Sequence, residues 1–306
     1  MKNAPSPILR IKSIAEQHQL LSLPKPEHPL LSILRFEDFP IIPNETTVRL
    51  TMDYYSITLK QQCDCKTKYG QTSYDYNEGV MSFVAPDQVL TQEGDLLPPP
   101  SGWLLAFHPD FIRGYPLGQK MGSYGFFQYA LHEALILSEK EEAALEHILK
   151  SIAQEVHLPI DKFSQDVLVS QLDLLLTYCQ RHYERQFITR KTPSSKLLTR
   201  LETLLADYFN GDTLADAGPP SVAYVAEQLC ISPKYLSDLL RQLTGQSAQQ
   251  HIQDKLLEKA KSLLTTTHLS VSEIAFQLGF GYSQSFSKLF KNKTSLSPLE
   301  FRQSFN

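Results

Sequence analysis

The last third of the sequence contains an internal repeat, and this repeat limits the possible folds more than any other feature. Apolar and hydroxyl-bearing positions of the first copy recur 49 or 50 residues later: Val225, Ala226 and Leu229 match Ile274, Ala275 and Leu278, and Leu236, Leu239, Leu240, Thr244 and Ser247 match Phe286, Leu289, Phe290, Thr294 and Ser297. Each copy reads as a short helix with a central alanine, a brief turn and an amphipathic helix. The repeat therefore predicts two helix-turn-helix units.

The starts and ends of these helices are marked too. Ser-x-x-Glu or Ser-x-x-Gln patterns, which satisfy free backbone donors at a helix start, begin at Ser247, Ser270 and Ser297. Gly279 occupies the turn of the second copy, where glycine takes a left-handed conformation without strain. Cys230 has the equivalent place in the first copy, so that turn is less well specified. One helix over about residues 248–265, roughly 25 Å long, joins the units and suits recognition helices in successive major grooves of DNA.

Three segments of the repeat resemble, in order and spacing, the signature of the AraC/XylS family of bacterial transcription regulators: Ile274-Ala-x-x-Leu-Gly-Phe280, Phe286-Ser-Lys-Leu-Phe-Lys291 and Ser297-Pro-x-x-Phe-Arg302. The resemblance covers about residues 195–302, roughly a third of the chain. It implies a cytoplasmic bacterial regulator that binds double-stranded DNA, with RNA polymerase as a further partner. It also implies a homodimer and a small-molecule effector, bound by an N-terminal domain that resembles the cupin-like sensing domain of many members by pattern alone.

The same resemblance places base-reading positions on the second helix of each unit. In the first, over about residues 233–243, they are Lys234, Ser237 and Asp238, with Arg241 one turn further on. Asp238 departs from the pattern, because a carboxylate repels phosphate, although it can accept a hydrogen bond from a cytosine amino group. The second helix offers Ser283, Gln284, Ser287 and Lys288, with Lys291 and Lys293 placed for phosphates. Gln284 suits adenine and Lys288 suits guanine.

The N-terminal half has a different pattern. Short β-branched and aromatic runs between turn signals over residues 47–107 predict a small β-barrel or sandwich. Ser138-Glu-Lys-Glu141 opens an amphipathic helix, a second is expected over about 161–183, and the basic segment 181–200 is interpreted as a hinge. The predicted fold class is α+β: a cupin-like β-barrel followed by two helices, then an all-α domain. The expected domains are 1–137 (sensing), 138–190 (helical dimerisation or packing) and 191–306 (double helix-turn-helix).

The strand region offers aromatic candidates for an effector pocket: Tyr54, Tyr55, Tyr74, Tyr76, Phe83 and Trp103. Aromatic residues in strands are more often plain core. We expect no catalytic residue, metal or cofactor, because the nine histidines are scattered and Cys63 and Cys65 have no further ligands nearby in the sequence. Two alternatives stay open: a cupin-type enzyme fused to a DNA-binding module, and an N-terminal half that only dimerises.

Charge adds little to these arguments. The net charge is −4, with eleven Lys and Arg against ten Asp and Glu in residues 196–306 and an excess of five acidic residues before them. Electrostatic attraction to DNA is therefore weak, and base readout has to supply more of the binding. With 42% hydrophobic and 20% charged residues and no apolar run of about 18 to 20 residues, the sequence indicates a soluble protein without a membrane partner.

Overall fold

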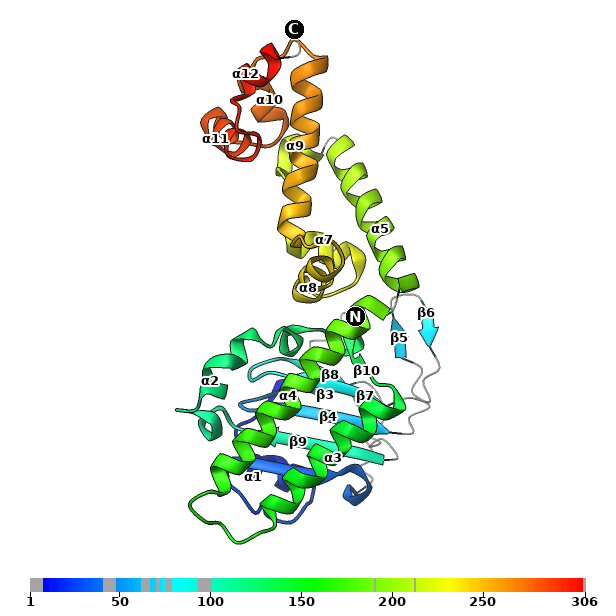
Figure 1. Ribbon diagram of the computed structural model, residues 1–306, viewed down its shortest axis with the longest axis vertical. Coiled ribbons are helices and arrows are strands. Elements are labelled where there is room, and N and C mark those ends of the chain that lie inside the picture. Colours follow the sequence, from blue (N-terminus) through cyan, green and yellow to red (C-terminus); the bar gives the residue numbers. More distant parts are fainter. Residues whose placement is uncertain are drawn as a thin grey trace, which may run out of the picture. The chain divides into compact units, whose positions relative to one another are not determined.

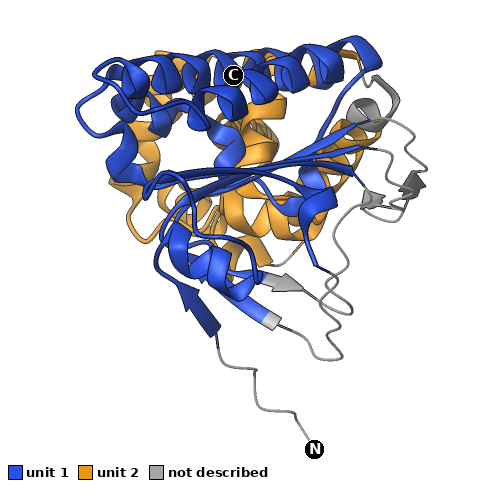
Figure 2. Cartoon of the chain, turned by 90° about the horizontal axis from the view of Figure 1, so that it is seen from below, with its two compact units in different colours: residues 1–186 blue, residues 187–306 orange. Residues whose placement is uncertain are grey.

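The computed structural model describes residues 8–40, 48–61, 67–69, 72–74, 79–92, 101–189, 191–211 and 213–304. The chain divides into two compact units, residues 1–186 and 187–306, and each is described by itself (Figure 2). Among the helices of these described ranges, none is long and apolar enough to cross a membrane.

Unit 1 is built on β-sheets. Its strands are β1 (Ile8–Ile11), β2 (Leu31–Arg35), β3 (Val48–Met52), β4 (Tyr55–Gln61), β5 (Thr67–Tyr69), β6 (Thr72–Tyr74), β7 (Val80–Val84), β8 (Leu90–Gln92), β9 (Ser101–Phe107) and β10 (Leu135–Ile136). They form a sheet in the order β1-β3-β8, an antiparallel sheet in the order β10-β7-β4-β9-β2, and the pair β5-β6. The α+β character is confirmed. The expected closed barrel is not formed by the strands of the described residues.

The helices of unit 1 lie on both faces of the five-stranded sheet, since Ile14 of the first helix is in one buried cluster with Val84 and Ala106, on the face opposite Met81. They are α1 (Ile14–Leu20), α2 (Pro116–Lys120), α3 (Glu139–Val156) and α4 (Ser164–Thr189), with the 3₁₀ helices η1 (Phe36–Asp38), η2 (Pro109–Ile112), η3 (Met121–Ser123), η4 (Gly125–Gln128) and η5 (Leu131–Glu133). The predicted start of α3 is confirmed, since the Ser138 N–H donates to Glu141 at 2.9 Å. α3 and α4 lie across the sheet (Figures 1 and 2), where Cys179 Sγ of α4 is 3.9 Å from Met81 Sδ of β7.

Unit 2 is helical. It contains α5 (Lys191–Asn210), α6 (Thr213–Ala217), α7 (Val222–Leu229), α8 (Pro233–Thr244), α9 (Ala248–Thr266), α10 (Val271–Gln277), α11 (Ser283–Thr294) and α12 (Pro298–Gln303). The boundary between the two compact units, at residues 186/187, falls within the predicted hinge segment 181–200, whose described part is helical in α4 and α5. Pro193 does not interrupt this second helix, because it is the third residue of α5. The N–H groups of the first turn have no intrahelical acceptor, so a proline there removes no hydrogen bond of the helix.

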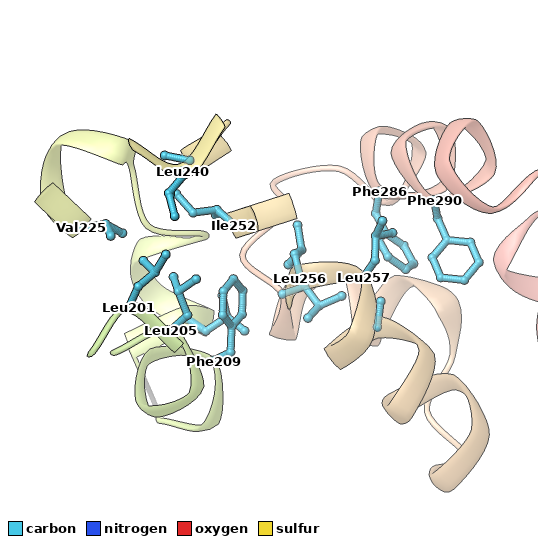
Figure 3. Close-up of a cluster of buried hydrophobic side chains, with 14 of the residues drawn as sticks. Leu201, Leu205, Phe209, Val225, Leu240, Ile252, Leu256, Leu257, Phe286 and Phe290 are labelled. Carbon is cyan, nitrogen blue, oxygen red and sulfur yellow. The ribbon is translucent and has the colours of Figure 1, made fainter. Parts of the chain in front are cut away.

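One hydrophobic core runs through both helix-turn-helix units. The predicted apolar positions are buried: Val225, Ala226, Leu229 and Leu236 of the first copy and Ile274, Ala275, Leu278 and Phe286 of the second are each at most 3% exposed. Leu256 and Leu257 of α9 lie between the two groups, and Leu201, Leu205 and Phe209 of α5 extend the same cluster (Figure 3). The joining helix α9 is therefore a shared wall of the core.

Candidate nucleic-acid interface

The turn between the two helices is built in the same way in both units. Two N–H groups bond back to carbonyls three and five residues earlier: Cys230 to Glu227 and Ile231 to Ala226, both at 3.0 Å, and Gly279 to Phe276 and Phe280 to Ala275, both at 2.9 Å. These bonds form a Schellman motif, which ends the first helix and redirects the chain. α8 and α11 are thus presented by equivalent turns.

Each helix-turn-helix copy contains two residues with a left-handed backbone conformation, one after each of its helices. In each copy one of these two residues is a glycine. In the turns, Cys230 has φ 58° and Gly279 has φ 77°; at the ends of the recognition helices, Gly245 has φ 77° and Ser295 has φ 64°. The left-handed region costs a residue with a Cβ about 1 kcal/mol. Cys230 therefore makes the same turn as Gly279 in spite of its side chain, and the first turn is defined as well as the second.

Gly279 is required for a second reason, which the sequence did not indicate. A Cβ atom on Gly279 would lie 2.2 Å from Cα of Gly218 and 2.7 Å from the carbonyl oxygen of Leu214. Gly218 follows α6, has φ 72° and is likewise a glycine in close contact. The backbone of the turn in the second helix-turn-helix copy therefore packs directly against the backbone at the end of α6.

The predicted start signals act as caps. The N–H of each capping serine donates to the side chain three residues on, at 2.7 Å in all three cases: Ser247 to Gln250, Ser270 to Glu273 and Ser297 to Glu300. The Ser270 N–H lowers the pKa of Glu273, and the Ser297 N–H lowers that of Glu300. The helices α9, α10 and α12 are thus fixed at their first turns.

Arg302 ties α12 to the end of α9. Its Nε donates to the carbonyl of Leu264 at 3.0 Å and its Nη2 to the carbonyl of Leu269 at 2.6 Å. Leu264 is in the last turn of α9, where carbonyls lack intrahelical partners and a cation is favoured. Arg302 is part of the family signature, but nothing in the sequence identified its acceptors.

In the first recognition helix, α8, three of the four predicted DNA-binding residues contact one another. Lys234 Nζ is 2.8 Å from Asp238 Oδ1, and Arg241 Nη1 is 3.5 Å from the same oxygen. The Asp238 side chain is 18% exposed, against 33% for Lys234 and 61% for Arg241. Ser237, the fourth predicted residue, is half-buried. The structure thus brings this predicted set together as an ion-pair cluster.

In the second recognition helix, α11, the predicted residues face solvent. Gln284, Lys288 and Lys291 are exposed, while Ser283 and Ser287 are half-buried. Within the described part of the chain, neither Lys288 nor Lys291 has a carboxylate within ion-pair distance. Tyr282, which precedes the helix and which sequence reasoning missed, is 76% exposed. Among the described residues, the cations of the second recognition helix are therefore exposed and not held in ion pairs.

Three of the predicted effector-pocket residues, Tyr54, Phe83 and Trp103, are buried and lie on two faces of the five-stranded sheet. Phe83 and Trp103 share the face of the sheet under α3 and α4, because their registers with Ile57 and Leu59 place them there. Tyr54 packs instead in the cluster that contains Val84 and Ala106, on the opposite face.

The remaining expectations for unit 1 concern residues of which less is described. For Tyr74 the structure describes the backbone in β6, and Tyr76 lies outside the described residues, as do Cys63 and Cys65. Tyr55 is half-buried and stacks on Phe107. Among the described side chains, no three His, Cys, Asp or Glu residues are grouped so that they could hold a metal ion.

Comparison with known proteins places the repeat in a family. Residues 225–304 match a family model described as a helix-turn-helix domain. The chain is 40% identical over 91 residues to the arabinose operon regulatory protein of Escherichia coli (strain K12), across 30% of this chain and 31% of the relative. It is 34% identical over 142 residues to the HTH-type transcriptional activator RhaS of Escherichia coli O139:H28, across 46% of each.

Among solved structures, the C-terminal domain of AraT, a response regulator from Geobacillus stearothermophilus, is 30% identical over 35% of this chain and 84% of that one, with a TM-score of 0.31. The matched part spans about a third to a half of the length of the curated relatives. The family model nevertheless coincides with both turns and both recognition helices, and residues 225–304 of this chain form a helix-turn-helix domain of the AraC type.

Proposed function

We propose that this protein is a transcription regulator that binds double-stranded DNA sequence-specifically through α8 and α11. The observation that carries the proposal is the presentation of Gln284 and Lys288 on an exposed helix face behind a rigid Schellman turn. Glutamine pairs with adenine by donating to N7 and accepting from the N6 amino group, and lysine donates to O6 and N7 of guanine. An exposed polar face on a single helix would be ordinary. Here a Schellman turn precedes a recognition helix twice in residues 187–306, once before α8 and once before α11.

The length of α9 supports simultaneous binding of the two helices. Its 19 residues correspond to roughly 28 Å at 1.5 Å per residue. The units at its two ends (Figure 1) add to that length, and successive major grooves on one face of DNA are about 34 Å apart. We therefore propose that one copy of the domain contacts two neighbouring major-groove segments.

Replacing Lys288 by alanine is expected to weaken binding to the cognate site by about tenfold more than binding to random duplex, since a base contact is lost with the charge. The cognate site is first selected from a random duplex library, and both affinities are then titrated by fluorescence anisotropy at one salt concentration. Lys291→Ala is the matched control, because a phosphate contact contributes equally to both duplexes. Equal losses for Lys288→Ala on both would contradict its base-reading role.

The finer parts of the proposal concern unit 1. We propose that it acts as a cupin-like sensing domain whose small-molecule effector, or whose dimerisation, gates DNA binding, and that the DNA-bound protein works with RNA polymerase. Its mixed α and β architecture on a separate compact unit is compatible with that role. We assign no enzymatic activity to the chain, since the relatives in the comparison are named as regulators.

Homodimerisation is also part of the proposal, and an apolar stripe at α4 supports it. Phe163, Val167 and Leu174 are 56%, 37% and 48% exposed, and their spacing of four and seven residues places them on one side of the helix. Asp166 and Arg181 are exposed toward opposite ends of α4. In an antiparallel pair of α4 helices these unlike charges approach one another, which favours a second copy as the partner.

Replacing Leu174 by glutamate is expected to weaken the dimer by at least about tenfold, because each protomer would bury a carboxylate in the stripe. Mass measured by light scattering after size exclusion, over a dilution series, gives the dissociation constant. Gln154→Glu on α3 adds the same charge at another exposed position and should leave the mass unchanged. A variant as dimeric as the parent, or a parent that is monomeric throughout, would exclude α4 as the interface.

A further inference from the structure

The two recognition helices carry different charges at equivalent positions. With the offset of 50 residues that relates them, Lys234 corresponds to Gln284, Asp238 to Lys288 and Arg241 to Lys291. The centre of the reading face is therefore negative in α8 and positive in α11. This difference lies within a shared backbone design, so it changes what the first helix recognises and leaves its presentation the same.

Asp238 holds the two cations of α8 in the free protein. Its Oδ1 lies 2.8 Å from Lys234 Nζ and 3.5 Å from Arg241 Nη1, one turn before and one turn after it on the same helix face. The carboxylate is the least exposed of the three groups, at 18%. We call these three residues the α8 clasp. A phosphate that takes up Lys234 or Arg241 must displace the carboxylate and then lies beside its negative charge.

We infer that Asp238 makes the first recognition helix selective by suppressing phosphate binding and by requiring a cytosine in the major groove. The inference rests on the proposed function and specifies what one half of that DNA interface recognises. A carboxylate accepts hydrogen bonds only, and the cytosine amino group is the base donor that aspartate characteristically reads. Lys234, released beside it, donates to the acceptors of guanine. Separating Asp238 from its two cations costs free energy, and this cost is compensated only where the base edges supply new hydrogen bonds to the carboxylate and to the released cation.

The substitution Asp238→Asn tests the clasp, because it keeps the shape of the side chain and removes the charge. We expect affinity for a random duplex at low salt to rise by about three- to tenfold, with a steeper dependence on salt by about one to two counterions, since two cations become available to phosphates. Binding-site selection from a random library should give one position where the parent requires cytosine and Asp238→Asn does not. The specificity ratio should fall by about tenfold.

Two further variants separate the clasp from a general effect of charge. Glu258→Gln removes one negative charge from the Lys255–Glu258 ion pair of α9, at 2.7 Å, outside the recognition helices. Its effect on random duplex should be smaller than that of Asp238→Asn. Asp238→Glu keeps a carboxylate within reach of Lys234 and should retain the low affinity for random duplex. Helix content by circular dichroism verifies that all three variants are folded.

The outcomes are distinguishable from those that test the proposed function. If the parent prefers no sequence at all, the proposed function fails, and the rise in random-duplex affinity of Asp238→Asn still tests the clasp. If the parent is specific but Asp238→Asn binds random duplex as weakly as before, or no more tightly than Glu258→Gln, the clasp is wrong. Retention of the same cytosine preference in Asp238→Asn overturns the assignment of the base.

Discussion

Replacing Gly279 by alanine is expected to lower the free energy of unfolding of unit 2 by roughly 3 kcal/mol or more. The methyl group would lie 2.2 Å from Cα of Gly218 and 2.7 Å from the carbonyl oxygen of Leu214. Both are backbone atoms, which cannot rotate away as a side chain can. The left-handed φ of 77° adds its own cost. The turn must therefore move away from α6, and α11 moves with it, so the variant should also lose DNA binding.

Gly245→Ala is the matched control for this prediction. Gly245 has the same φ of 77°, but a Cβ atom there meets nothing within 4 Å. It should lose only about 1 kcal/mol, the cost of the backbone conformation. Urea unfolding followed by far-ultraviolet circular dichroism measures both losses, while fluorescence of Trp103, the single tryptophan, reports on unit 1. Equal losses in the two variants would show that the close contact with Gly218 contributes nothing.

Replacing Arg302 by methionine is expected to cost about 2 to 4 kcal/mol. Two charge-assisted hydrogen bonds are lost at once, those to the carbonyls of Leu264 and Leu269, and both acceptors are left beneath an apolar side chain. The same unfolding measurement applies, and Lys291→Met, which removes an exposed cation from α11, is expected to change stability by less than about 0.5 kcal/mol. An Arg302→Met protein as stable as the parent would mean that α12 is held by apolar packing alone.

Most of unit 2 was predictable because its signals are local. The capping serines, the central alanines and the glycine at the second turn each specify backbone conformation within a few residues of themselves. Most of these signals occur in both copies of the repeat, so each copy supports the interpretation of the other. The position of α9 then followed from the helices on either side. This is why the bounds of α8 and α9 agree with the predicted ranges to within one residue at each end.

Features that depend on residues far apart in the chain were not predictable. The contact between Gly218 and Gly279 joins segments 61 residues apart, and no periodicity indicates it. Phe83 and Tyr54 read alike as strand aromatics, and only the register of β4 and β7 places Phe83 under the helices and Tyr54 across the sheet. The proposed roles of the DNA-binding residues stay predictions, because exposure indicates availability and not the partner.

The shared core has a consequence for how the two units can diverge. Leu256 and Leu257 belong to the same cluster as the buried side chains of both units, so neither copy has a core of its own. One residue inserted in α9 would turn one recognition helix by about 100° around the other. The residues of the two recognition helices that lie outside this core can therefore change independently, as Asp238 and Lys288 illustrate. The distance and the relative orientation of the two helices cannot change without disrupting the shared core.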